Sequence, residues 1–169
     1  MDEQLPPEAL TPASAPVLYR LHLARLVAEL DRVTVGMRPG INRLLTGIET
    51  YWDACFSRRD VLRAMTAATA GDRATQAAMR RQGRAFVYLL RSELIGMGCT
   101  DAGVRAWELL GRVRKVAVLE RRHGRIGTEA RAEVLRWASE LGQPLRLSGL
   151  PPSRYARLRQ AANPALRAA

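Results

Sequence analysis

The sequence contains few of the residues from which catalytic centres are built. Its two histidines, His22 and His123, stand in no metal-ligating spacing, and its two cysteines, Cys55 and Cys99, form no Cys-x-x-Cys motif. No glycine-rich phosphate loop and no Gly-x-Ser-x-Gly segment occurs. We therefore expect no catalytic residue, no metal site and no cofactor, so that the protein is not an enzyme, and we expect both thiols to be buried and unreactive.

Apolar runs long enough to cross a membrane are missing as well. No uninterrupted run approaches the roughly 18 residues typical of a spanning helix. Acidic residues and prolines occupy the N-terminus, where a secretory signal would place a basic flank and an apolar stretch. The sequence thus predicts a cytoplasmic protein that does not associate with membranes.

No segment alternates convincingly between apolar and polar residues, as a half-buried strand would, whereas helical spacings of three and four recur along residues 17–143. Breaks rich in glycine and proline separate the predicted helices, which cover residues 17–35, 41–56, 59–69, 72–96, 101–123 and 128–141. The second of them has the clearest apolar stripe, formed by Ile41, Leu44, Leu45, Ile48, Trp52 and Cys55. In the first, the predicted stripe consists of Leu18, Leu21, Ala24 and either Val27 or Ala28, and it could extend to Asp31.

These patterns predict an all-α fold, a six-helix orthogonal bundle in a single domain. Residues 1–16 contain four prolines and few large apolar groups, so we expect a flexible leader there. Residues 17–143 form the helical domain. Residues 144–169 form a basic, proline-containing tail, in which residues 153–162 could form a short helix.

The order and lengths of the helical segments resemble the region that follows the helix-turn-helix in the TetR family of bacterial transcriptional regulators. The closest points are residues 48–56 followed by the short helix 59–69, and the helix pair 106–123 and 128–141, which is similar to the family's two C-terminal dimerisation helices. The resemblance covers about three quarters of the chain. No three-helix segment precedes Val17, so we expect no sequence-specific reading of DNA by this chain itself.

The resemblance implies that a small apolar molecule occupies a cavity among the central helices and moves the first long helix. Carried over by position, the candidate cavity walls are Tyr51, Trp52, Cys55, Met65, Phe86, Leu89, Leu90 and Trp107. The same residues at helical spacing could instead form an ordinary close-packed core.

The resemblance also implies a homodimer, because the last two long helices carry wide apolar faces with a tryptophan on each. The predicted dimer interface consists of Trp107, Leu110, Val113, Val116, Ala117, Val134, Trp137, Ala138 and Leu141. The function predicted from these features is that of a dimeric small-molecule-sensing or protein-interaction module.

The charge supports a different class of function. The net charge is +11, and the stretch from Arg112 to the C-terminus has thirteen basic residues against four acidic ones. These cations could lie on solvated helix faces, or they could make the chain an arginine-rich nucleic-acid-binding protein that makes non-specific phosphate contacts through its basic C-terminal third. Tyr155 is the only aromatic residue of the tail, which is unlike single-strand binders that stack bases on several exposed rings.

Overall fold

The computed structural model describes residue 11 and residues 13–141, and within this part the chain is all-α, with no β-strand. The leader before Thr11 and the basic tail, with its predicted short helix, lie outside the described residues. The helices are α1 (Ala15–Thr34), α2 (Ile41–Ser57), α3 (Arg59–Ala68), α4 (Arg73–Gly83), α5 (Ala85–Gly96), α6 (Ala102–His123) and α7 (Thr128–Glu140). None of these helices is both long and apolar enough to cross a membrane.

The predicted helix 72–96 is interrupted once, and it forms the two consecutive helices α4 and α5 with only Arg84 between them. At the junction the Arg84 N–H donates to the Arg81 carbonyl, and the Val87 N–H donates to the Arg84 carbonyl, so the chain tightens locally into three-residue turns. Gly83, a poor helix former, ends α4 at this point. Counted as one interrupted helix, α4 and α5 complete the six predicted segments.

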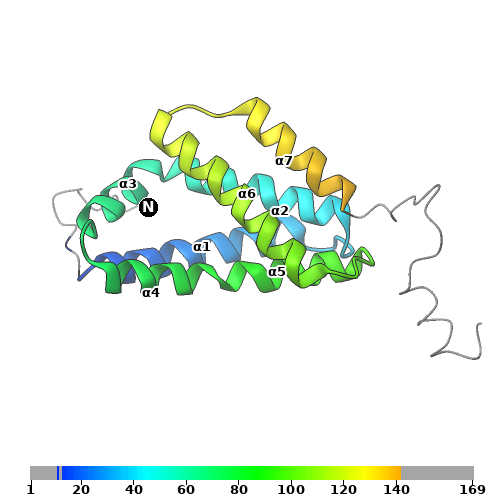
Figure 1. Cartoon of the computed structure of the whole chain (residues 1–169), viewed down its shortest axis with the longest axis horizontal. Helices are drawn as coiled ribbons and strands as arrows, with labels where there is room; N and C mark the ends of the chain where they lie inside the picture. Colours follow the sequence, from blue (N-terminus) through cyan, green and yellow to red (C-terminus); the bar gives the residue numbers. More distant parts are fainter. Residues whose placement is uncertain (1–10, 12, 142–169) are drawn as a thin grey trace, which may run out of the picture.

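The centre of the bundle is the pair α2 and α6, since α2 packs against α1, α3, α5, α6 and α7, and α6 packs against α2, α3, α5 and α7. In Figure 1, α1 and the α4–α5 pair run along one side of the molecule, while α7 lies on the opposite side of α6. The bundle therefore has a side formed by α1, α4 and α5 and a side formed by α7, with α2 and α6 between them.

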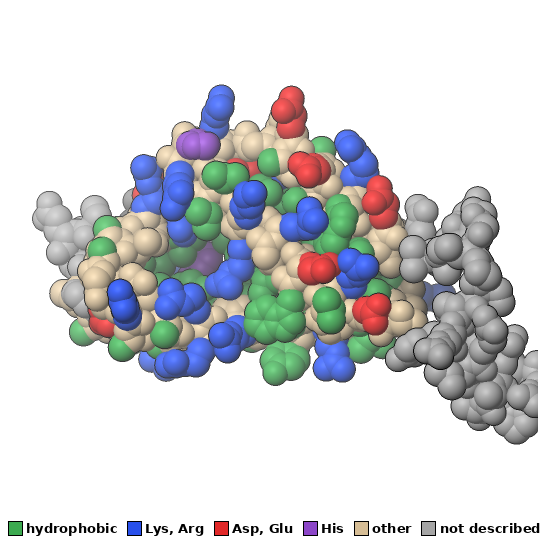
Figure 2. All heavy atoms as spheres, viewed as in Figure 1, with side chains coloured by type: hydrophobic (Ala, Val, Ile, Leu, Met, Phe, Trp, Pro, Cys, Tyr) green, Lys and Arg blue, Asp and Glu red, His purple; other side chains and the backbone are tan. Residues whose placement is uncertain are grey.

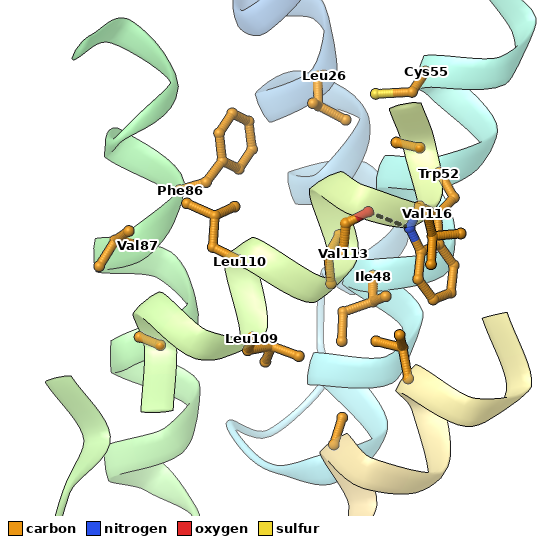
Figure 3. Packing of buried hydrophobic residues seen from close by; sticks show 14 of the residues in the cluster. Leu26, Ile48, Trp52, Cys55, Phe86, Val87, Leu109, Leu110, Val113 and Val116 are labelled. Carbon is orange, nitrogen blue, oxygen red and sulfur yellow. Dashed lines mark hydrogen bonds between the residues drawn. The ribbon is translucent and has the colours of Figure 1, made fainter. Parts of the chain in front are cut away.

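Trp52 is the centre of the core. Its ring is fully buried, and its indole N–H donates to the main-chain carbonyl of Val113 at 2.9 Å, which ties α2 to α6 (Figure 3). Ile48, Val113 and Val116 pack around it in the same cluster. A buried indole with a satisfied N–H fixes the register of the two central helices.

The side chain of Arg131 holds α7 in place. Its Nε donates to Glu120 Oε1 at 2.7 Å and its Nη2 to Glu120 Oε2 at 2.8 Å, while its Nη1 donates to Asp53 at 2.7 Å. Glu120 is only 3% exposed, and its Oε1 also accepts the N–H of Gly127 at 2.9 Å. The Arg131 guanidinium lies 5.3 Å from the Trp52 ring centroid. The Arg131 side chain thus connects α7 to α6 and to α2, and Glu120 connects α6 to the turn that precedes α7.

This packing corrects the predicted dimer face. Six of its nine residues are buried inside the chain's own core, namely Leu110, Val113, Val116, Ala117, Val134 and Ala138. Trp137 and Leu141 are partly buried against the same core, and only Trp107 is largely exposed. The apolar face of α7 is covered by α2 and α6, and that of α6 is covered by α2, α5 and α7, because α7 folds back onto its own chain.

The first helix also buries a different face from the predicted one. Leu21 is 52% and Val27 38% exposed, whereas Ala15, His22 and Leu26 are buried. The helix begins two residues before the predicted start, with Pro16 in its first turn, where the missing N–H of proline costs nothing. The buried face of this helix is thus shifted by about one residue from the predicted face, and His22 lies in the interior.

We predict that Arg131→Met lowers the free energy of unfolding by about 3–5 kcal/mol, because it leaves the carboxylate of Glu120 buried without its cation. Replacing both partners, Arg131→Met with Glu120→Met, should cost less than the single change. Arg136→Met, at an exposed position on the same helix, is the control. Urea unfolding followed by circular dichroism measures all three, and a loss below about 1 kcal/mol for the single variant would show that the ion pair does not hold α7.

Candidate ligand-binding cavities

An apolar cavity of about 100 Å³ lies between α1, α2, α5 and α6. Its walls include Val27, Leu30, Leu44, Gly47, Ile48, Tyr51, Phe86, Leu89, Leu90, Leu110 and Val113. Arg43 and Glu93 also line it, joined by an ion pair of 2.8 Å, and the second oxygen of Glu93 accepts the N–H of Gly40 at 3.2 Å. Asp31 and Thr34 of α1 complete the lining, so the cavity is a mainly hydrophobic space with charged side chains at its margin.

A second, polar cavity of about 150 Å³ shares Tyr51, Phe86 and Leu110 with the first. The rings of Tyr51 and Phe86 meet edge to face, with centroids 5.7 Å apart. Its other walls are Tyr19, His22, Leu23, Cys55, Leu62, Gly83, Arg114, Ala117, Val118 and Arg121. Figure 2 shows a hollow on one face of the molecule, with a histidine side chain inside it and arginine side chains around it. Two cavities of different polarity therefore lie side by side, and α1 contributes to the walls of both.

His22 is the buried polar group of the second cavity. Its side chain is only 7% exposed, and its Nδ1 has no hydrogen-bond partner among the described residues. Burial, together with the nearby charge of Arg58, lowers the pKa of His22 from 6.5 to about 4. The imidazole is therefore neutral near pH 7 and keeps one ring nitrogen unsatisfied.

The hydroxyl and thiol groups of the polar cavity are neutral as well. Burial raises the pKa of Tyr51 well above 10, and burial also raises the pKa of Tyr19, although the adjacent Arg114 opposes this. Burial raises the pKa of the Cys55 thiol from 9.0 to about 11, although a hydrogen bond from Tyr51 and the charges of Arg121 and Arg114 oppose it. Cys55 is thus a buried thiol without thiolate character, as predicted, whereas Cys99 is only partly buried.

Two guanidinium groups, those of Arg114 and Arg121 on α6, supply the charge of this cavity, and no carboxylate lines it. Neither arginine has an ion-pair partner in the described part of the chain. Gly83 makes room for one of them, since a Cβ at this position would lie 2.8 Å from Arg114 Nη2 and 3.1 Å from the Tyr19 hydroxyl oxygen. The cavity consequently has a positive potential that nothing within it neutralises.

The structure assigns the eight predicted cavity residues to three places. Tyr51 and Phe86 line both cavities, Leu89 and Leu90 line the apolar one, and Cys55 lines the polar one. Trp52 and Met65 line neither, since both are close-packed in the core. Trp107, expected inside, is 51% exposed and lies beneath the Arg84 guanidinium, 5.9 Å from its ring centroid.

Sequence reasoning missed the residues that give the second cavity its chemistry, namely Tyr19, His22, Arg114 and Arg121. These residues belong to no motif, and the two pairs come from helices far apart in the sequence. Their one signal is that polar side chains interrupt otherwise buried helix faces, and this signal is readable only when the buried face is assigned correctly. Within the described residues, no three His, Cys, Asp or Glu side chains gather as a metal site would require.

No protein-family model, curated protein or solved structure matches this chain at a significant level. The resemblance to TetR-type regulators therefore depends on the helix pattern, and the geometry of the two cavities is the basis for any assignment of function.

We predict that the unfolding free energy falls by up to about 3 kcal/mol between pH 6.5 and pH 4 through His22 alone. The unfolded chain takes up the proton near pH 6.5, whereas the folded chain resists it until about pH 4, so acid favours unfolding. His22→Gln, which cannot titrate, should show a correspondingly flatter pH dependence in urea unfolding. Parallel pH profiles of the two proteins would contradict the buried, neutral imidazole.

Proposed function

We propose that this chain is a small-molecule-sensing module related to the ligand-binding half of TetR-type regulators. The observation that carries the proposal is the pair of adjacent cavities inside the bundle, both walled by α1. Concave sites with apolar walls and a few converging polar groups are the usual form of small-molecule sites. Five of the eight residues that the TetR resemblance implied as cavity walls do line these two spaces.

The cavity volumes limit the ligand. An engineered apolar cavity of about 150 Å³ holds a benzene molecule, so the polar cavity suits a group about as large as one aromatic ring, and the apolar cavity of about 100 Å³ suits a group no larger than that. The wall of Tyr51, Phe86 and Leu110 separates them, and a larger ligand would have to displace those side chains. The proposed effector is accordingly compact.

Helix α1 is the element through which binding would act. It contributes Val27, Leu30 and Thr34 to the apolar cavity and Tyr19 and His22 to the polar one. It packs against α2, α3 and α4, whereas α7 is held by the buried ion pair on the other side of α6. A ligand that binds one position of α1 more tightly than another shifts the helix toward that position, which is the requirement for a sensor.

The alternative function is non-specific binding of nucleic-acid phosphates by the basic residues from Arg112 onward. The described part of this stretch, up to residue 141, gives that function less support. Arg114 and Arg121 line the polar cavity, and Arg131 is paired with Glu120. Arg112 lies over the Trp137 ring, 4.4 Å from its centroid. Four of the predicted phosphate-binding cations thus already have roles within the fold, which favours the sensing proposal.

The proposed homodimer requires a different face from the one implied by the sequence. Val104 and Trp107 on α6 and Tyr88 on α5 are 62%, 51% and 71% exposed, and α5 packs along α6. Hydrophobic side chains gather at the lower edge of the face shown in Figure 2. An exposed group of large apolar residues is typical of a protein contact, and we propose that a second copy of the chain covers this one.

For the homodimer we predict that Trp107→Lys yields monomer, because a cation at this position cannot be desolvated against a second apolar face. Size-exclusion chromatography with light scattering at micromolar concentration measures the mass. Val61→Lys, which adds the same charge to an exposed valine on α3, should leave the dimer intact. A wild-type protein that is already monomeric at this concentration would rule out the dimer.

For the sensing function we predict that a single-ring apolar compound such as benzene or toluene raises the melting temperature, since a ligand at one hundred times its dissociation constant stabilises the folded state by about 2.7 kcal/mol. Gly47→Leu should abolish this shift by filling the apolar cavity. A Cβ at Gly47 meets only Leu30 Cδ2, at 3.7 Å, so there is room for a side chain.

Gly111→Leu is the matched control, because position 111 is exposed on α6 and a Cβ there meets nothing within 4 Å. It makes the same substitution in a helix without entering the cavity. A ligand shift that survives Gly47→Leu, or a wild type that responds to no compound, would contradict the proposed function.

A further inference from the structure

The groups that line the polar cavity have the composition of an anion site. Arg114 and Arg121 bring two positive charges, Tyr19 and Tyr51 bring hydroxyl groups, and no acidic side chain lines the space. Glu120, whose charge acts on Cys55, is already bound by Arg131 and by the N–H of Gly127. The cavity therefore contains hydrogen-bond donors and cations, and no described residue of the chain supplies an anion to pair with them.

The unpartnered nitrogen of His22 is a second, independent observation. More than nine tenths of this side chain is buried, and Nδ1 has no hydrogen-bond partner among the described residues. A buried polar atom without a partner costs roughly 1–3 kcal/mol unless something in the cavity satisfies it. A neutral imidazole can carry its proton on Nδ1 and donate it to an anionic oxygen.

We infer that the polar cavity binds the carboxylate group of a compact organic acid, with Arg114 and Arg121 as its charge partners and Tyr19 and His22 as further donors. Arginine pairs with a carboxylate through two parallel N–H bonds, a geometry that its planar fork provides. The apolar part of the acid lies against the Phe86 and Leu110 wall. The inference rests on the proposed sensing function and names the class of its ligand.

Gly83 permits a test that leaves the charges in place. An alanine methyl there would lie 2.8 Å from Arg114 Nη2, so the guanidinium has to move away from its place beside Tyr19. Alanine is a better helix former than glycine, so this substitution should not destabilise the fold. A loss of binding in Gly83→Ala, with an unchanged melting temperature, therefore reports on the positions of the Arg114 guanidinium and the Tyr19 hydroxyl and not on folding.

The experiment is isothermal titration calorimetry with phenylacetate and its neutral isostere phenylacetamide. We expect phenylacetate to bind at least tenfold more tightly than the amide. Arg114→Gln should remove this preference, and Gly83→Ala should weaken acid binding at least tenfold. The matched controls are Arg112→Gln, which removes a charge from the outer face of α6, and Gly103→Ala, at an exposed glycine with open space around it.

Binding should also leave a signature on the imidazole. A carboxylate beside His22 stabilises the charged ring, so its pKa should rise from about 4 when phenylacetate is bound. The carbon-bound ring protons of His22 report this in an NMR titration, with the exposed His123 as the internal reference. An unchanged His22 titration in the presence of bound acid would place the acid elsewhere and overturn the inference.

The outcomes separate this inference from the proposed function. Equal binding of acid and amide would overturn the anion site while leaving a sensing module. If neither phenylacetate nor phenylacetamide binds, and benzene and toluene produce no thermal shift, both the inference and the proposed function are overturned. If Arg114→Gln and Gly83→Ala both leave phenylacetate binding unchanged, the acid binds outside this cavity and the inference is contradicted. Two further probes test the ligand class. If phosphate or octanoate binds more tightly than phenylacetate, a compact carboxylic acid is excluded as the ligand.

Discussion

The buried pair of Arg131 and Glu120 is the interaction on which the arrangement of the other elements depends. A carboxylate that is 3% exposed is stable only because Arg131 meets it with two N–H bonds and Gly127 with a third. The same guanidinium reaches Asp53 and lies against Trp52, whose indole N–H is bound to the carbonyl of Val113. Helices α2, α6 and α7 are thus joined by polar contacts of defined geometry, which fix the register of the core more strictly than apolar packing alone.

This arrangement gives the two sides of the bundle different properties. On the side of α7, Val134 and Ala138 are buried against α2 and α6, and a separate cavity of about 340 Å³ lies at the turn between α6 and α7. On the side of α1, α4 and α5 the packing is incomplete, and both cavities open there. Val113 belongs to both halves, since its carbonyl holds Trp52 and its side chain lines the apolar cavity. Helices α2 and α6 therefore supply one wall of the cavities, while α1 and α5 supply the other.

Burial also decides the charge state of the polar cavity. The pKa of His22 is lowered and those of Tyr19, Tyr51 and Cys55 are raised, so that desolvation keeps all four groups uncharged near pH 7. The guanidinium groups cannot lose their protons, and they remain the charged groups of this space. The positive potential is therefore permanent, and it requires an external anion or solvent to balance it.

The sequence by itself determined the all-α class and nearly every helix boundary, because glycine, proline and a period of three to four residues act locally. It also identified the buried stripe of α2 around Trp52 and five of the cavity residues. It could not determine which apolar faces cover each other, because burial depends on contacts between helices far apart in the chain. The tertiary structure alone decided that α7 covers its own chain, leaving Trp107 exposed, and that His22 on α1 meets Arg114 on α6 across one cavity. The position of α7 follows from helix packing and from the Arg131 contacts, the meeting of His22 with Arg114 follows from helix packing, and no local pattern encodes either.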